Sequence, residues 1–198
     1  MRPFRTLIAA AAIVMAFAGT AFAIDGARSG DFLPVKRAAP APTGASAICS
    51  AYDWACASGA MTPAGAEVLK IAAKVNMAAN AAVRPISDQS QFSVAERWSL
   101  PTARGGDCED YALLKKQQLI AAGVAPNRLL VAVVLDRQRQ PHAVLVLRSD
   151  MGDFVLDNLT KRVLPWQSTG YAFLRMQDPR DPSRWVSVMV QAEGGLSS

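Results

Sequence analysis

The chain has 198 residues, a formal net charge of +5 at pH 7 and a hydrophobic fraction of 51%. This length suits one domain, because two independent cores would each be small. Charged residues make up only 19% of the chain, which excludes a wholly disordered protein. The basic residues form no cluster interleaved with aromatic residues, so the sequence does not indicate nucleic-acid binding.

The N-terminal segment has the features of a secretory signal peptide. Arg2 and Arg5 precede an almost unbroken apolar run over residues 7–18, and the small-x-small triplet at 21–23 fits a cleavage site. The apolar run is too short to span a membrane comfortably, and no stop-transfer charges follow it. We therefore expect residues 1–23 to be removed on export across the inner membrane, leaving a soluble mature chain in the periplasm.

Export places the cysteines in an oxidising compartment, where disulfides persist. Cys49 and Cys56 lie seven residues apart, close enough to close a small disulfide loop, which leaves Cys108 as the odd thiol. Two alternatives stay open: Cys49 and Cys56 as buried free thiols, and a zinc site that gathers the three cysteines with His142. The zinc site lacks the closely spaced cysteine pair that structural zinc sites usually show.

The first half of the mature chain reads as a tail followed by helices. Residues 24–46 are rich in Ala, Pro, Gly and Ser without apolar periodicity, which predicts a flexible tail. A threonine–proline pair at 62–63 is typical of a helix start, and apolar residues at helical spacing continue this helix to about residue 80. An Arg–Pro pair ends it, and residues 85–106 are expected to form a loop with short helical pieces.

The second half reads as one helix followed by strands. The helix is predicted to begin at Asp107, because an aspartate at the N-cap, acids in the first turn and Gly123 after the last turn are usual helix-end signals. Strands are predicted over residues 129–135, 142–147 and 154–159, with further strand segments at 162–166 and 185–190. This order indicates an α+β domain over 47–191, with helices packed on an antiparallel sheet and a C-terminal tail over 192–198.

Cys108 has a position that suits a nucleophile. It lies in the first turn of the predicted helix, where backbone N–H groups and the helix dipole favour a thiolate and can stabilise a developing oxyanion. The chain has one histidine, and a four-residue turn at 149–152 places His142 and Asp157 on the same face of the strand pair. Together they match a nucleophile, base and orienting residue. The alternative is a structural role for each residue.

Three acidic residues surround the cysteine: Asp107, Glu109 and Asp110. In the simplest interpretation they cap the helix. Three carboxylates beside a thiolate also raise its pKa by like-charge repulsion, which is unusual for a nucleophile. A bound Ca²⁺ ion would offset this charge and takes oxygen ligands of this kind.

Three sequence blocks carry a resemblance to a known family. GDCEDYALLKKQQLIAAG, HAVLVL and GDFVLDNL resemble the bacterial transglutaminase-like cysteine proteinases, which include periplasmic adhesin proteases of the LapG type. The resemblance extends from about Cys49 to Val190 and implies a papain-like, transglutaminase-like fold. Carried onto this sequence, it implies a triad of Cys108, His142 and Asp157. It also implies calcium ligation by Asp107, Glu109 and Asp110.

The resemblance further implies an exported cysteine endopeptidase that works through a thioester acyl-enzyme. Its substrate would be a cell-surface protein such as an adhesin, and its regulator a membrane receptor. Two alternatives stay open at this point. The same triad supports acyl transfer to an amine, as in transglutaminases and amidases, because the outcome depends on whether water or an amine reaches the acyl-enzyme. A non-catalytic, calcium-dependent binding module would also keep these residues.

Overall fold

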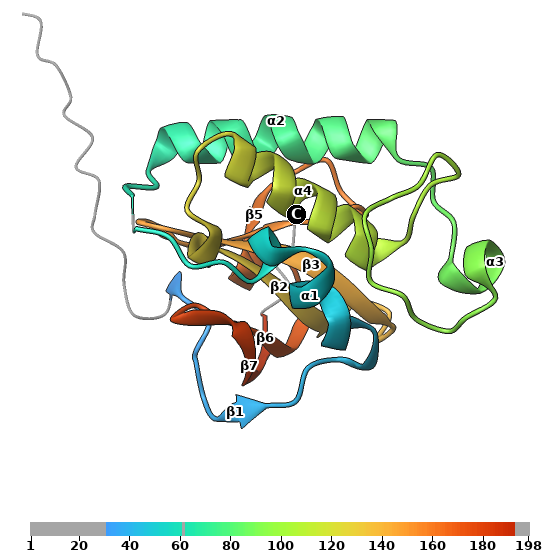
Figure 1. Ribbon diagram of the computed structural model, residues 1–198. Coiled ribbons are helices and arrows are strands. Elements are labelled where there is room, and N and C mark those ends of the chain that lie inside the picture. Colours follow the sequence, from blue (N-terminus) through green and yellow to red (C-terminus); the bar gives the residue numbers. More distant parts are fainter. Residues whose placement is uncertain (1–30, 61, 193–198) are drawn as a thin grey trace, which may run out of the picture.

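The computed structural model describes residues 31–60 and 62–192, so the signal peptide expected at 1–23 lies outside it, as do residues 193–198. A seven-stranded antiparallel sheet forms the centre of the molecule, with helices against one of its faces (Figure 1). This confirms the α+β class. No helix in the described part of the chain is long and apolar enough to cross a membrane.

Two central strands form the middle of the sheet and are buried on both faces. The strands are β1 (Ala38–Ala39), β2 (Leu129–Leu135), β3 (Pro141–Ser149), β4 (Gly152–Leu156), β5 (Leu164–Pro165), β6 (Ala172–Asp178) and β7 (Asp181–Gln191). Their order across the sheet is β1-β7-β6-β2-β3-β4-β5. The continuous apolar runs of β2 and β3 fit this burial, because a strand covered on both faces has no polar side to alternate with.

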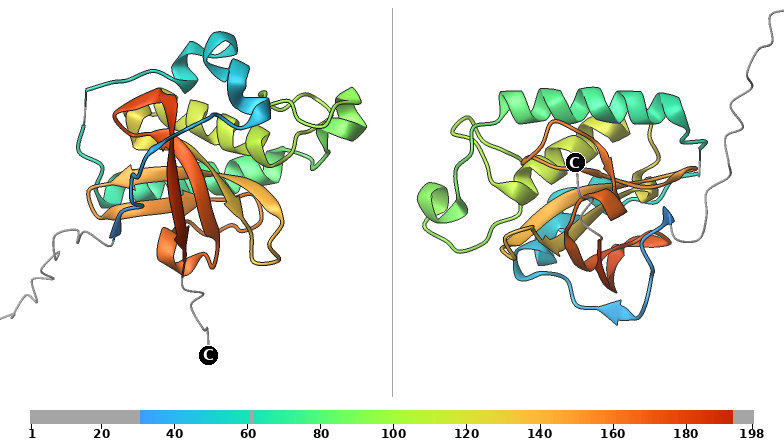
Figure 2. Two further views of the ribbon diagram at one scale, coloured as in Figure 1. Left: turned by 90° about the horizontal axis from the view of Figure 1, so that it is seen from below. Right: turned by 180° about the vertical axis from the view of Figure 1, so that it is seen from behind.

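The helices pack on the sheet in two layers, with α4 next to the strands and α2 outside it (Figure 1). They are α1 (Ile48–Ala51), α2 (Ala66–Ala82), α3 (Asp88–Phe92) and α4 (Cys108–Ala121). α4 lies against β3 and β2, and α2 packs on the outer side of α4 (Figure 1). α3 and the loop that follows it project to one side, beyond the sheet (Figure 2).

Each face of the sheet has its own apolar core. Leu145 and Leu147 of β3 belong to the core under the helices, whereas Val144 and Val146 belong to the core on the opposite face. This follows from the two-residue period of a strand. His142 lies two residues before Val144, near the start of β3.

Residues 31–46 belong to the fold, and the prediction of a flexible tail is wrong for them. β1 pairs with β7, at the edge of the sheet. Leu33 is buried, and its N–H donates to Asp153 Oδ2 at 2.8 Å. The composition misled because this segment is ordered by partners far along the chain, which impose no local periodicity.

Two predicted element ends also shift. α2 begins after Gly65 rather than at the threonine–proline pair, because the Ala64 N–H donates to Asp150 Oδ2 at 2.7 Å and holds the preceding segment on the β3–β4 turn. β4 ends at Leu156 rather than at residue 159. There the Leu159 N–H donates to Asp157 Oδ1 at 3.0 Å, and this contact turns the chain out of the sheet.

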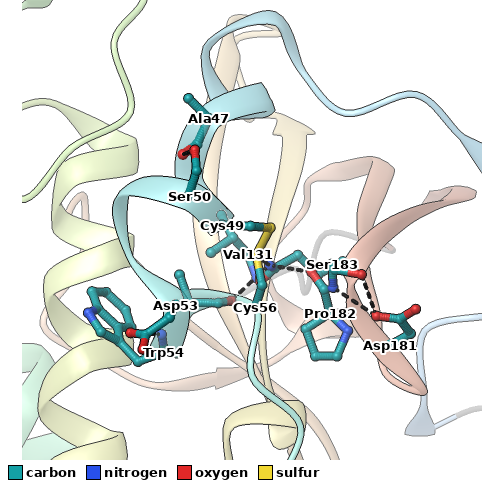
Figure 3. Close-up of a disulfide and its surroundings, with 12 residues drawn as sticks. Ala47, Cys49, Ser50, Asp53, Trp54, Cys56, Val131, Asp181, Pro182 and Ser183 are labelled. Atoms are coloured by element: carbon teal, nitrogen blue, oxygen red, sulfur yellow. Dashed lines mark hydrogen bonds between the residues drawn. A yellow bond between two sulfur atoms is a disulfide. The ribbon is translucent and has the colours of Figure 1, made fainter.

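Cys49 and Cys56 form a disulfide, which excludes the free-thiol and zinc alternatives for this pair. Figure 3 shows the bond beside Pro182 and Ser183 of β7. The neighbouring Ala55 carbonyl accepts from Lys116 Nζ at 2.6 Å and from Gln177 Nε2 at 3.0 Å. The disulfide loop is therefore tied both to α4 and to the sheet.

Candidate active site

Cys108 is the first residue of α4, with Asp107 at the N-cap as predicted. The first N–H groups of a helix have no partner inside it, so they are available to groups beside the thiol. All three cysteines lie in the described part of the chain, and Cys108 is the free one. Its Sγ donates to Glu109 Oε2 at 3.2 Å.

The surroundings of the thiol disfavour its ionised form. Burial raises the pKa of the Cys108 thiol well above its usual range, and the Glu109 and Asp107 carboxylates raise it further. The backbone N–H of Ala143 lowers it, but by less. The helix N-terminus predicted to stabilise a thiolate is thus outweighed by burial and by the acidic residues that sequence analysis identified beside it.

A pair of glycines fixes the loop before Cys108. Gly105 has a φ of +128°, and a Cβ there would lie 1.9 Å from the Arg84 carbonyl oxygen. The Gly106 N–H donates to the same oxygen at 3.1 Å. The loop therefore approaches the end of α2 closely, and this contact sets the point at which α4 begins.

His142 and Asp157 form a buried pair beyond the thiol. His142 Nε2 lies 2.9 Å from Asp157 Oδ1. The ladder pairs Ser149 with Gly152 and Leu145 with Leu156, which is the register predicted from the turn. Because Asp157 occupies Nε2, Nδ1 is the ring nitrogen left for a proton acceptor role.

Tyr171, which the sequence analysis missed, completes the surroundings of Asp157. Its hydroxyl donates to Asp157 Oδ2 at 2.6 Å, and its ring meets the His142 ring edge to face, with centroids 6.0 Å apart. Burial alone would raise the pKa of Asp157, but hydrogen bonds from His142, Leu159 and Tyr171 hold it below the usual range. Tyr171 lies just before β6, a strand that was not predicted, so its sequence context offered no signal.

Cys108 and His142 line one cavity of about 240 Å³. Trp98, Glu96 and Ala143 form part of its wall. The Trp98 indole N–H donates to Glu96 Oε2 at 3.3 Å, and its ring packs edge-on against a second tryptophan in the core. The cavity is thus an open space beside the thiol and the imidazole, with a rigid aromatic wall.

An acidic cluster of Asp88, Asp107 and Glu109 lies beside the thiol, and Glu109 also lines the cavity. Their ligand atoms lie within 4.8 Å of one another. Each residue has one buried oxygen without a hydrogen-bond partner: Asp88 Oδ1, Asp107 Oδ1 and Glu109 Oε1. Burial, with the charge of Asp107, raises the pKa of Glu109 to about 8. Three converging, unpartnered carboxylate oxygens fit a hard divalent cation such as Ca²⁺.

Asp110 lies outside this acidic cluster. Its Oδ1 accepts from the Ser99 N–H at 3.0 Å and from the Ser99 hydroxyl at 3.3 Å. Asp107 does not cap α4 with its side chain either, because its Oδ2 accepts the Asp88 N–H at 3.0 Å. Of the three predicted calcium ligands, the structure gathers two and adds Asp88. No spacing pattern pointed to Asp88, which precedes Asp107 by 19 residues.

Known proteins resemble the chain in sequence family and in fold. The family described as bacterial transglutaminase-like cysteine proteinase (BTLCP) matches residues 35–193. The calcium-bound structure of LapG from Legionella pneumophila shares 24% identity and a TM-score of 0.51, over 65% of this chain and 74% of that one. EGTA-treated LapG gives 24%, 0.47, 55% and 62% for the same measures. No curated protein sequence matches the chain.

Proposed function

The chain belongs to the bacterial transglutaminase-like cysteine proteinases, and within this family of peptidases we propose that it is an exported endopeptidase acting through Cys108, His142 and Asp157. The observation that carries the proposal is the 2.9 Å contact between His142 and Asp157, beside a cavity that also holds the free thiol. Since the family consists of peptidases, the substrate is a polypeptide.

In the proposed reaction, His142 Nδ1 takes the proton of the Cys108 thiol. The thiolate attacks the carbonyl carbon of the scissile bond, and the Cys108 N–H donates to the oxyanion. The C–N bond then breaks, His142 gives its proton to the leaving amine, and the acyl group remains on Cys108 as a thioester. Water that His142 deprotonates hydrolyses this thioester and restores the thiol.

Asp157 orients the base in this mechanism. By accepting the proton of Nε2, its carboxylate leaves Nδ1 unprotonated and stabilises the imidazolium that forms next. Tyr171 and the Leu159 N–H keep this carboxylate ionised and fixed in position. The support for these roles is the geometry of the pair and its register within the sheet.

We also propose that Asp88, Asp107 and Glu109 bind Ca²⁺. The support is the set of buried, unpartnered oxygens and the shared fold with calcium-bound LapG. Bound there, the ion supplies positive charge that offsets the carboxylates beside the thiol. Asp110, the third ligand expected from the sequence, accepts from Ser99 through Oδ1 and is outside the proposed set because it is not among the residues whose ligand atoms converge.

The compartment and the partners remain proposals too. Residues 1–23 and the disulfide both support export to the periplasm, an oxidising compartment. From the family resemblance we propose a cell-surface protein such as an adhesin as the substrate, and a membrane receptor as the regulator.

The test compares the cell-surface proteins of cells that make the wild-type chain or the Cys108→Ala variant. Mapping of N-terminal peptides should reveal new N-termini that depend on Cys108. Isopeptide-linked products in their place would establish acyl transfer. If the two samples are the same and iodoacetamide does not label Cys108, the non-catalytic binding module is the better account.

A further inference from the structure

A second cavity, of about 450 Å³, lies next to Asp157 and Tyr171. The first cavity contains Cys108 and His142 but not Asp157, whereas the second contains Asp157 but not His142. The hydrogen-bonded His142–Asp157 pair therefore separates the two spaces. The β2–β3 turn runs beside both cavities, because it leads from Arg137, in the wall of the second cavity, to His142, in the wall of the first.

The charge available to a ligand in this second cavity is positive. Arg137 and Arg162 both line it, and both residues are exposed. Arg137 Nε donates to the Thr169 carbonyl at 2.8 Å, which anchors the guanidinium and leaves its two Nη groups without a partner in the described part of the chain. Within that same part, the Arg162 side chain makes no ion pair or hydrogen bond.

Asp157, the one acidic residue among those lining this wall, pairs with His142 and forms no ion pair with Arg137 or Arg162 in the described part of the chain. Its Oδ1 accepts from His142 and from the Leu159 N–H, and its Oδ2 accepts from the Tyr171 hydroxyl. Its hydrogen-bonding capacity is thus used within the protein. The Nη groups of Arg137 and the guanidinium of Arg162 are therefore available to an outside acceptor.

We propose that the second cavity binds the carboxylate of an aspartate or glutamate in the substrate, on the leaving-group side of the cleaved bond. This rests on the proposed peptidase function, in which His142 protonates the leaving amine. The two cavities adjoin, because the ring centroid of Tyr171, which lines the second, lies 6.0 Å from that of His142, which lines the first. A carboxylate is the anion a peptide offers, and guanidinium groups bind it through paired hydrogen bonds.

The test uses a synthetic decapeptide library, cleaved by the mature wild-type protein and sequenced by mass spectrometry. Asp and Glu should be enriched at positions that follow the cleaved bond. In the Arg137→Gln/Arg162→Gln double variant this enrichment should fall about tenfold, since hydrogen bonds to charged groups are lost. Arg139→Gln is the matched control, because Arg139 lies on the same turn but donates to Gln191 and does not line the cavity.

A binding measurement separates this inference from the proposed function. The Cys108→Ala variant is mixed with the same library, and retained peptides are identified with and without the two arginine substitutions. Retention of acidic peptides that depends on the arginines, without any cleavage by wild type, would support the cavity and overturn the peptidase. Cleavage or retention without an acidic preference would overturn the cavity and leave the peptidase standing.

Discussion

Two groups of polar residues near Cys108 differ in how completely their hydrogen-bonding atoms find partners within the protein. In the first group, His142, Asp157 and Tyr171, both carboxylate oxygens of Asp157 have a donor within 3.0 Å. In the acidic cluster, Asp88, Asp107 and Glu109 each have a buried oxygen with no hydrogen-bond partner. Buried acceptors without donors are costly, so the acidic side requires something that the chain does not supply.

This difference separates two tasks within one site. The base His142 is already positioned by the fold, because the β3–β4 ladder sets its register with Asp157 and three donors hold the Asp157 carboxylate. Burial, and after it Glu109 and Asp107 of the acidic cluster, raise the pKa of the thiol that the mechanism needs as a thiolate. The protein thus prepares its base by folding, and we expect it to prepare its nucleophile by binding a cation.

The largest effect is expected from substitution of the proposed nucleophile or base. Cys108→Ala and His142→Ala should each lower the rate of peptide cleavage by at least about 10³-fold, because residues of a triad act as a unit. Cleavage of a surface-derived peptide measures this, and circular dichroism should show an unchanged fold. Full activity in either variant would contradict the assignment of that residue.

The second largest effect is expected on calcium-dependent stability, through the acidic cluster. Ca²⁺ at 100 times its dissociation constant should stabilise the wild-type chain by about 2.7 kcal/mol, because it binds the folded state. Thermal unfolding with Ca²⁺ or EGTA measures this. Asp88→Asn and Glu109→Gln should abolish most of the gain.

The control is Glu96→Gln, which neutralises an acid in the wall of the same cavity but outside the cluster. It should retain the calcium-dependent gain. Equal loss in all three variants would point to general charge repulsion rather than to a site.

Tyr171→Phe should have a moderate effect, because it removes one donor from a carboxylate that keeps two others. A lost hydrogen bond to a charged group lowers kcat about tenfold, with KM changing little. Steady-state kinetics across pH distinguish this role from a purely structural one. A fall in stability with an unchanged kcat would mean that Tyr171 only packs.

The smallest effect is expected for Asp110→Asn. The amide oxygen can still accept from Ser99, and the residue lies outside the acidic cluster. The calcium-dependent rise in melting temperature should therefore match that of the wild type. Loss of that rise would restore Asp110 to the ligand set that sequence alone suggested.

Local periodicity and turn length allow several parts of this molecule to be predicted from its sequence. The start of α4 at Cys108, the apolar strand β2 and the β3–β4 register all follow from patterns within a few residues, so Cys108, His142 and Asp157 could be chosen before the structure. The family resemblance supported the same three residues.

Contacts with distant segments, in contrast, depend on how the whole chain packs. Asp88, at the start of α3, reaches the cluster across 19 residues, and Tyr171, in the loop before β6, reaches Asp157 across 14. β1 is ordered by β7, and β6 pairs through bulged ladders that break the two-residue pattern. Such contacts leave no local signal, because a buried charge is stabilised by whichever groups the folded chain brings to it.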